Sequence, residues 1–355
     1  MLKFLILLVV ITKIVSSIKL YRSLRVFKNA NDLHSHVKIE QTGEMPIPKE
    51  DELLLKMKCC GVCHTDLHLI DAITPPNHPV GHEGVGEIIQ LSSSSRNKHG
   101  LEIGDIVGVP WMYFSCGNCQ YCITGHEPLC VNRLSTGLDV PGALQDFMIA
   151  KSTHVVKKPN NLSNEAFAPF LCAGVTTFKA LKECDLIAGN KIGIIGAAGG
   201  LGSYSIQYAK AMGFQPIAID LPHKLDFCKQ LGAETVAANN LNSIKNSCDA
   251  VIVLAPNLNS YSEAIDLVKR NGKVVFVSLP EGKFECDPSK VVFNHLTLKG
   301  SIVGTREDMK EALDFASRGL VKSYIETDSF ENIDHIFQRL RRNDITGRIV
   351  VNFDK

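Results

Sequence analysis

Residues 191–202 read KIGIIGAAGGLG, a short apolar run that ends in closely spaced glycines. The run has the length and composition of a β-strand, and a helix-like stretch, residues 201–212, follows the glycines. Glycines at such a turn let the backbone approach a pyrophosphate, which the free N–H groups at the start of the helix can bind. The stretch therefore predicts a dinucleotide site in an α/β fold.

The acidic residue that follows this turn narrows the choice of dinucleotide. The glycine spacing is G-x-x-G-x-x-G, one residue longer than the common G-x-G-x-x-G, and the turn alone is compatible with a purely structural role. Asp220 ends the next predicted strand, 18 residues after Gly202. A carboxylate there accepts hydrogen bonds from both ribose hydroxyls and repels a 2′-phosphate, which favours NAD over NADP. Lys224 is either a further ribose contact or a solvated surface residue. The predicted cofactor residues are Gly196, Gly199, Gly200, Leu201, Gly202, Asp220 and Lys224.

The chain on either side of the turn divides into regions that differ in their pattern of predicted strands and helices. Strand-like residues 215–219, 250–254 and 273–279 alternate with helical stretches such as 260–270, which predicts a doubly wound parallel sheet. Earlier residues, 21–154, form short apolar runs broken by Gly and Pro, typical of a β-rich domain. Two helical stretches and a strand end the chain (306–317, 332–342 and 348–352). We expect a catalytic domain at 18–174, a dinucleotide domain at 175–303, and a segment, 304–355, that returns to the first domain.

Composition limits the function classes. The 355 residues predict two domains, and 38 Lys+Arg against 37 Asp+Glu give a net charge of +1, without the basic excess of a nucleic-acid-binding protein. A hydrophobic content of 45% excludes wholesale disorder. Twelve cysteines are too few for a disulfide-stapled scaffold.

Residues 1–17, MLKFLILLVVITKIVSS, are an apolar N-terminal segment. The early Lys3, the hydrophobic run and the small residues at its end are typical of a signal peptide. The alternative is an apolar extension on a cytosolic protein. The many cysteines favour the cytosol, where thiols stay reduced, and both interpretations remain open.

Four cysteines in the first domain have the spacing C-x2-C-x2-C-x7-C: Cys116, Cys119, Cys122 and Cys130. Four thiolates so close along one loop can complete a tetrahedral Zn²⁺ shell. An iron–sulfur cluster is the competing interpretation. A complete thiolate shell leaves no open position, so we expect this zinc to be structural.

A second set of metal-ligating residue types is dispersed along the chain. Cys63, His82, Glu83 and Cys172 lie in the segments CGVCHTDLH (60–68), GHEG (81–84) and LCAG (171–174). No spacing rule joins residues so far apart, so the residues alone leave each as an ordinary buried side chain.

These segments, the four-cysteine run, GAAGGLG (196–202), YAKAMG (208–213), EALDF (311–315), RGLVKS (318–323) and the terminal GRIVV together resemble one family. The chain is similar to the zinc-dependent medium-chain alcohol dehydrogenases, most of all to their tetrameric yeast-type branch. The resemblance covers the chain from about residue 19 onward. It implies a GroES-like β-rich catalytic domain and a Rossmann domain, with the active site between them.

The resemblance also assigns roles. It implies a catalytic zinc on Cys63, His82 and Cys172, with Glu83 as an acid able to ligate it and Asp66 orienting a ligand. Thr65 and His68 match the proton relay, and their other interpretation is local turn hydrogen bonding. His64 and Arg348 match contacts to the cofactor pyrophosphate, although either alone resembles a surface charge. Val277 and Val303 match further cofactor contacts, and Trp111 matches a wall of the alcohol pocket.

The loop that the family uses for a second pocket wall is short here. Residues 69–81 read LIDAITPPNHPVG, without a counterpart of the second pocket tryptophan of yeast-type enzymes. We expect a larger pocket that prefers butanol, hexanol or benzyl alcohol to ethanol; the alternative is that neighbouring loops close the gap.

The predicted function is reversible hydride transfer from a primary alcohol to NAD, with two Zn²⁺ per chain. The partners are a small alcohol or aldehyde and further copies of the chain in a homotetramer or homodimer, not nucleic acid. A polyol or aryl-alcohol dehydrogenase on the same scaffold is the first alternative, and a non-catalytic binding relative is the second.

Overall fold

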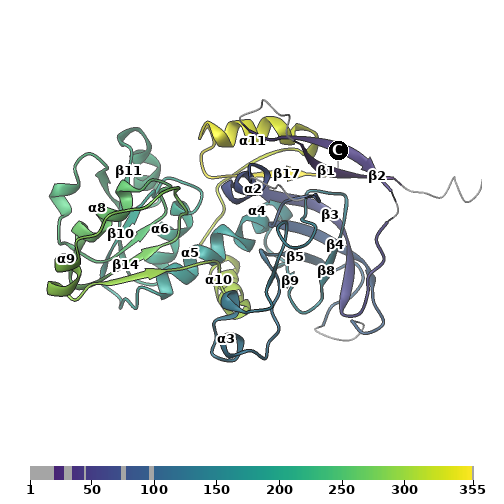
Figure 1. Ribbon diagram of the computed structural model, residues 1–355, viewed down its shortest axis with the longest axis horizontal. Helices are drawn as coiled ribbons and strands as arrows, with labels where there is room; N and C mark the ends of the chain where they lie inside the picture. Colours follow the sequence, from purple (N-terminus) through teal and green to yellow (C-terminus); the bar gives the residue numbers. More distant parts are fainter. Residues whose placement is uncertain (1–19, 28–33, 44, 73–76, 96–99, 354–355) are drawn as a thin grey trace, which may run out of the picture.

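The computed structural model describes residues 20–27, 34–43, 45–72, 77–95 and 100–353. The apolar segment 1–17 and residues 73–76 of the short loop lie outside them. Figure 1 shows two lobes side by side, a parallel sheet with its helices at the left and a β-rich lobe at the right, with helices α5 and α10 where they meet. No helix in the described ranges is both long and apolar enough to cross a membrane.

The left lobe is built on a six-stranded sheet whose strands all run parallel to their neighbours. Its order is β12-β11-β10-β13-β14-β15, which in chain order is 3-2-1-4-5-6, the doubly wound arrangement of dinucleotide-binding domains. The prediction of this sheet is confirmed. Its strands are β10 (Lys191–Ile195), β11 (Gln215–Asp220), β12 (Glu234–Ala237), β13 (Cys248–Val253), β14 (Val268–Phe276) and β15 (Thr297–Gly300).

Helices and short 3-10 turns connect these strands: α6 (Gly202–Ala211), η3 (Pro222–Lys224), α7 (Leu225–Gln230), η4 (Leu241–Ile244), α8 (Asn259–Leu267) and α9 (Pro288–Phe293). The helix predicted over 260–270 was too long. It ends at Leu267, because the buried Val268 pairs with Cys248 and begins β14. Residue periodicity could not separate the last helical turn from the first strand residues.

The right lobe contains a seven-stranded sheet ordered β16-β17-β3-β4-β5-β9, with β8 also paired to β3. β16 and β17, at one edge of this sheet, come from the end of the chain. β17 pairs antiparallel with β3. The strands are β3 (Glu52–Val62), β4 (Gly84–Leu91), β5 (Ile106–Val109), β8 (Phe147–Lys151), β9 (Val156–Lys157), β16 (Ile325–Ser329) and β17 (Arg348–Asn352).

Smaller elements complete this lobe. Two ribbons form from β1 (Tyr21–Phe27) with β2 (His36–Thr42), and from β6 (Met112–Phe114) with β7 (Leu134–Ser135). The remaining elements are α2 (His64–Ile70), α3 (Gln120–Ile123), η1 (Glu127–Leu129), α4 (Asn164–Phe167), η2 (Ala168–Leu171), η5 (Phe330–Asn332) and α11 (Ile333–Arg341).

Helices α5 (Ala173–Lys182) and α10 (Arg306–Ser317) join the two lobes. One apolar core is shared across the junction, since Cys59 and Val85 of the right-hand sheet belong to the same cluster as Ile192 and Ile194 of β10. The fully buried Tyr208 of α6 donates a hydrogen bond to the Ala312 carbonyl of α10 (3.1 Å). The two lobes therefore share a packed core at their junction.

Candidate functional site

The dispersed cysteines and histidine come together at one place. Cys63 follows β3, His82 and Glu83 precede β4, and Cys172 lies between η2 and α5. Their ligand atoms all lie within 4.8 Å of one another, and Cys63 Sγ is 3.2 Å from His82 Nε2. His82 and Glu83 are fully buried. Two thiols and an imidazole with this clustering match the donor set of a catalytic zinc site with one open position.

Asp66 sets the orientation of the imidazole. Its carboxylate only accepts, so His82 Nδ1 donates to Asp66 Oδ1 (2.9 Å), and Nε2 is the ring nitrogen that faces the cluster. Asp66 also accepts from the backbone N–H groups of Cys63 (3.0 Å) and Gly81 (3.1 Å). One buried carboxylate thus fixes two of the three segments that carry ligands, those of Cys63 and His82.

The charges at the cluster also fit a cation. Burial raises the pKa of the Cys63 thiol, but a hydrogen bond from Cys172 and the positive charges of His82 and Arg348 outweigh it, so its pKa lies well below the ordinary value. Burial raises the pKa of Glu83 to about 7, although Arg348 forms an ion pair with it. The second Glu83 oxygen, Oε2, is buried without a hydrogen-bond partner, which fits a site where it would contact a bound metal ion.

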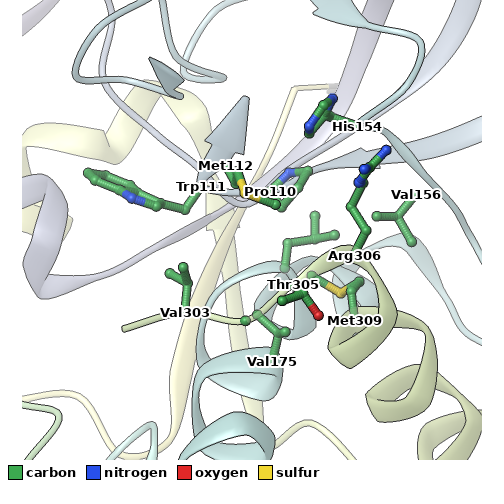
Figure 2. Close-up of a pocket in the computed structure, with 12 residues that line it drawn as sticks. Pro110, Trp111, Met112, His154, Val156, Val175, Val303, Thr305, Arg306 and Met309 are labelled. Carbon is green, nitrogen blue, oxygen red and sulfur yellow. The ribbon is translucent and has the colours of Figure 1, made fainter. Parts of the chain in front are cut away.

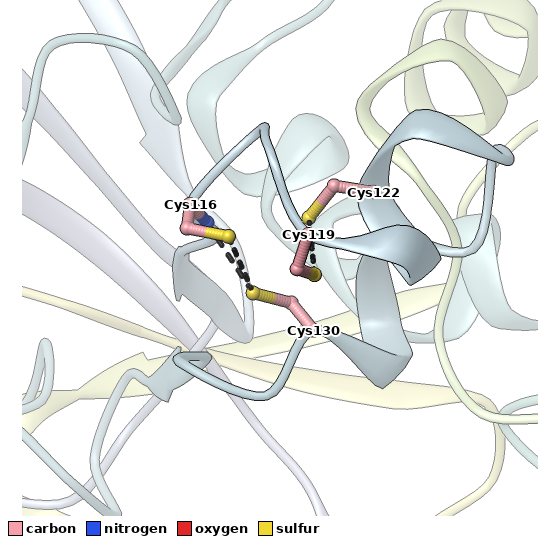
Figure 3. A group of neighbouring side chains, drawn as sticks. All are labelled: Cys116, Cys119, Cys122 and Cys130. Atoms are coloured by element: carbon pink, nitrogen blue, oxygen red, sulfur yellow. Dashed lines mark hydrogen bonds between the residues drawn. The ribbon is translucent and has the colours of Figure 1, made fainter.

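The four clustered cysteines form a second group, whose sulfurs turn toward one another from a single excursion of the chain (Figure 3). Cys116 Sγ and Cys130 Sγ are 3.5 Å apart, and Cys119 Sγ and Cys122 Sγ are 3.6 Å apart. Hydrogen bonds from backbone N–H groups, chiefly that of Cys122, lower the pKa of Cys119 to about 6. Four thiols with this compact geometry and a lowered thiol pKa fit a tetrahedral metal ion. We call residues 116–130 the cysteine lobe.

The glycine turn lies at the carboxyl end of β10, next to the start of β17. Gly196 has φ +87°, a left-handed conformation that a side chain would strain. Gly200 packs against Arg348 at the start of β17, because a Cβ placed on Gly200 would lie 2.6 Å from Arg348 Cδ. Gly199 closes the turn with a hydrogen bond to the Gly196 carbonyl (3.2 Å), and Leu201 and Gly202 begin α6. The turn therefore leads directly into the first N–H groups of α6, beside Arg348.

Other predicted cofactor residues line the same edge. Asp220 ends β11, and its oxygens accept from the N–H groups of Ala198 and Leu221 (both 2.8 Å). Val277 follows β14, and its N–H bonds the Val253 carbonyl (3.1 Å). Arg348 is buried, and its Nε has no partner. An unpartnered guanidinium N–H above a glycine turn fits an anion such as a pyrophosphate. Lys224 ends η3, half-buried.

The relay candidates lie on α2, immediately after Cys63. The Thr65 N–H donates to Cys63 Sγ (3.3 Å), and the Thr65 side chain is half-buried. His64 and His68, one turn apart on the same helix, are exposed. The helix thus leads from the buried cluster to the surface within seven residues.

Trp111 lies beside the cluster of candidate metal ligands that contains His82. Its ring stands edge-on to His82, with centroids 5.1 Å apart, and its indole N–H is buried without a partner. It lines a pocket with Val175, Val303, Thr305 and Met309 (Figure 2). Apolar side chains make up much of the lining, and His154, Thr305, Arg306 and the unpartnered indole N–H of Trp111 are its polar groups.

Known proteins share this architecture. The family model of the alcohol dehydrogenase GroES-like domain matches residues 49–160, and that of the zinc-binding dehydrogenases matches residues 200–318. An alcohol dehydrogenase of Geobacillus stearothermophilus is 41% identical over 334 residues, 90% of this chain and 97% of that protein.

The chain belongs to the zinc-dependent medium-chain alcohol dehydrogenase family.

Two further relatives extend the comparison. Alcohol dehydrogenase 2 of Caenorhabditis elegans is 37% identical, with 87% of this chain and 91% of that protein aligned. The solved structure of an acetophenone reductase from Geotrichum candidum, in complex with NAD, superposes with a TM-score of 0.83 at 29% identity, covering 94% of this chain and 97% of that one. This alcohol dehydrogenase accordingly has the mixed α/β fold and the activity that its motifs predict, and it acts on small alcohols and aldehydes.

Sequence reasoning missed a set of polar residues around the start of α10 in this enzyme. Glu127 of the cysteine lobe binds Arg306, 179 residues away, and His154 lies beside them. Only the capping pattern Thr305-x-x-Asp308 was available as a local signal, and it indicates a helix start rather than a site.

Proposed function

We propose that the enzyme is an NAD-dependent, zinc-containing dehydrogenase of primary alcohols, working in both directions. The convergence of Cys63, His82 and Cys172 beside Trp111 carries this proposal, and Arg348, paired with Glu83 of this cluster, connects it to the glycine turn. These three residues would hold the catalytic zinc, and the cysteine lobe would hold a structural one. Bound zinc would stabilise the negative charge that an alcohol oxygen acquires as it loses its proton.

The residues of the chain have separate tasks in this reaction. Asp66 holds the His82 ring in the tautomer whose Nε2 can ligate. Thr65 would accept the alcohol proton at its hydroxyl oxygen while it gives up its own hydroxyl proton, and the exposed His68 would take that proton up on an imidazole nitrogen and release it to solvent. Trp111 and Val303 exclude water from the reacting carbon, and Glu83 can join the ligand set.

The cofactor proposal has its own support. Asp220 stands at the end of β11 where a ribose would lie, and Arg348 offers its unpartnered Nε above the turn. His64 adds an imidazole N–H contact to the pyrophosphate, because desolvation of the ring lowers its pKa and favours the neutral ring, and Lys224 adds a ribose contact. The related acetophenone reductase was solved with NAD, which agrees with this choice of dinucleotide.

The preferred alcohol is the finer proposal. The short loop 69–81 favours longer or aromatic primary alcohols over ethanol, with aryl-alcohol or polyol oxidation as the second candidate. Each further methylene that the pocket buries contributes roughly 0.8 kcal/mol, or about fourfold in kcat/KM.

A series from ethanol to octanol, with benzyl alcohol and a polyol, tests these points by NADH production, with zinc content measured on the same sample. We expect two zinc ions per chain and a rising series. A steady decline of kcat/KM with chain length would overturn the proposal of an enlarged pocket. A preference for the polyol would support the alternative, a polyol dehydrogenase.

Assembly and location complete the proposal. We infer a homotetramer or homodimer, because β15 is an edge strand and Val292 and Phe293 on the preceding α9 are 65% and 81% exposed. A cytoplasmic location is supported by twelve free cysteines. Mass spectrometry of the mature N-terminus distinguishes it from the secretory alternative, which requires loss of residues 1–17.

A further inference from the structure

Val303 adopts a backbone conformation that its side chain disfavours. Its φ is +42°, in the left-handed region, and the residue is only 9% exposed. A β-branched residue in this region is a steric outlier, which persists only where the surrounding structure over-determines it. The surroundings of residues 303–306 should therefore contain the groups that impose this conformation.

One set of restraints comes from the junction helices. Thr305 and Asp308 form a reciprocal capping box at the start of α10. Lys182 of α5 donates to Asp308 Oδ1 (2.8 Å), and Lys179 Nζ lies 3.7 Å from Oδ2. These contacts fix α10, the helix that follows Val303, against α5.

The opposing restraint comes from the cysteine lobe. Glu127, 8% exposed, accepts the Arg306 backbone N–H at Oε2 (3.0 Å) and the Arg306 Nε–H at Oε1 (2.9 Å), with a further bond from Nη2. A carboxylate that binds both the backbone and the guanidinium fork of one residue fixes its position and orientation. Arg306 is the first residue of α10, only three positions after Val303.

Figure 2 shows the consequence for the pocket. Arg306 and His154 lie at one side, Trp111 and Val303 lie at the other, and the segment 303–306 passes between them. Only Gly304 and Thr305 separate Arg306 from Val303, so a shift of the Arg306 backbone would also move the Val303 side chain.

We propose that Glu127 is a positioning residue for the alcohol pocket: through Arg306 it holds Val303 in its strained conformation against the cavity beside Trp111. The proposal rests on the proposed placement of the alcohol between Trp111 and Val303. It gives the cysteine lobe a role in substrate selection beyond its stability.

Two conservative variants test the contact, Glu127→Gln and Arg306→Lys, together with their double variant. Asp146→Asn is a matched control, because Asp146 binds the Arg22 backbone N–H (2.7 Å), Nε (3.0 Å) and Nη2 (2.7 Å) in the same pattern on β1, away from the pocket. The main readout is the ratio of kcat/KM for benzyl alcohol to that for ethanol, which does not depend on the fraction of active enzyme. The Kd for NADH, by fluorescence, and the zinc content are measured alongside.

We expect Glu127→Gln and Arg306→Lys each to shift the ratio by roughly fourfold, the change that one buried methylene makes, with two zinc ions retained. The double variant should shift the ratio as much as each single variant does, because the two substitutions remove the same Glu127–Arg306 contact. Asp146→Asn should leave the ratio unchanged. In a Val303→Gly background, where the left-handed conformation is unstrained, Glu127→Gln should shift the ratio less.

Trp111→Ala separates the two ways in which the proposal can fail. If Trp111→Ala shifts the ratio and both contact variants leave it unchanged, the pocket is correctly placed and Glu127 has no positioning role. If none of the three variants shifts it, the pocket placement itself is wrong and the inference fails with it. Arg306→Lys keeps the charge, so it decides the question should Glu127→Gln not fold.

Discussion

Asp220 is the residue from which we expect the clearest change in cofactor choice. Its carboxylate already binds the N–H groups of Ala198 and Leu221, so it is held rigidly at the ribose position. Asp220→Gly should narrow the NAD/NADP ratio of kcat/KM by on the order of 10- to 1000-fold, because repulsion of the 2′-phosphate is removed. Asp226→Asn, an exposed charge on α7, is the control and should leave the ratio as it is. An unchanged ratio in the glycine variant would place the determinant elsewhere.

His154 is a second residue with a measurable consequence. Burial and the nearby Arg306 lower its pKa to about 4, although Glu127 acts in the opposite direction, and its Nε2 accepts the Ser115 N–H (2.9 Å). The folded state therefore favours the neutral ring. Its contribution to stability is complete above about pH 6.5 and is lost as pH falls toward 4, by about 3 kcal/mol in total.

The free energy of unfolding of His154→Gln, measured between pH 7 and pH 4, checks this expectation. The variant should be less sensitive to acid than the wild type, and the difference between the two curves isolates His154 from the other acid-sensitive groups. Parallel curves would contradict the assignment.

At the scale of elements, the cysteine lobe and the cluster of Cys63, His82, Glu83 and Cys172 should respond differently to loss of a ligand. Cys119→Ala should lower Tm by on the order of 10 °C, because an incomplete thiolate shell releases the metal that joins α3 to η1. Cys63→Ala should abolish turnover but leave one zinc ion and a folded chain, since Asp66 still joins its segments through hydrogen bonds. Thermal unfolding and zinc analysis on the two variants decide between these outcomes. Equal losses of activity with unchanged Tm in both would refute the division into a structural and a catalytic site.

At the scale of the whole molecule, the exposed apolar side chains near β15 should mark the contact between subunits. Light scattering should give the wild type a molar mass of two or four times 38.9 kDa. Phe293→Asp should have a smaller molar mass, because a buried charge without a partner at the interface opposes association. Leu279→Asp, which alters another exposed apolar residue of the same lobe (76% exposed), shows how far the interface extends. A single-chain mass for the wild type would end the oligomer proposal.

The sequence by itself determined the elements whose signals are local. The strand Lys191–Ile195, the helix Arg306–Ser317 and the strand Arg348–Asn352 were predicted with their observed bounds, since each begins or ends at a glycine, a cap or a clear change in hydrophobic pattern. The parallel sheet followed from the alternation of strands and helices. The four-cysteine run identified a metal centre because its ligands share one loop.

Only the tertiary structure brought together what the chain separates. Cys63, His82 and Cys172 meet because three different element ends converge at the junction, and no spacing rule encodes that convergence, so only the family resemblance indicated it in advance. Glu127 and Arg306 are joined across 179 residues, and the left-handed conformation of Val303 opposes its local preference. Propensity and periodicity report the energy of short segments, whereas these features depend on contacts that exist only after the two lobes have packed.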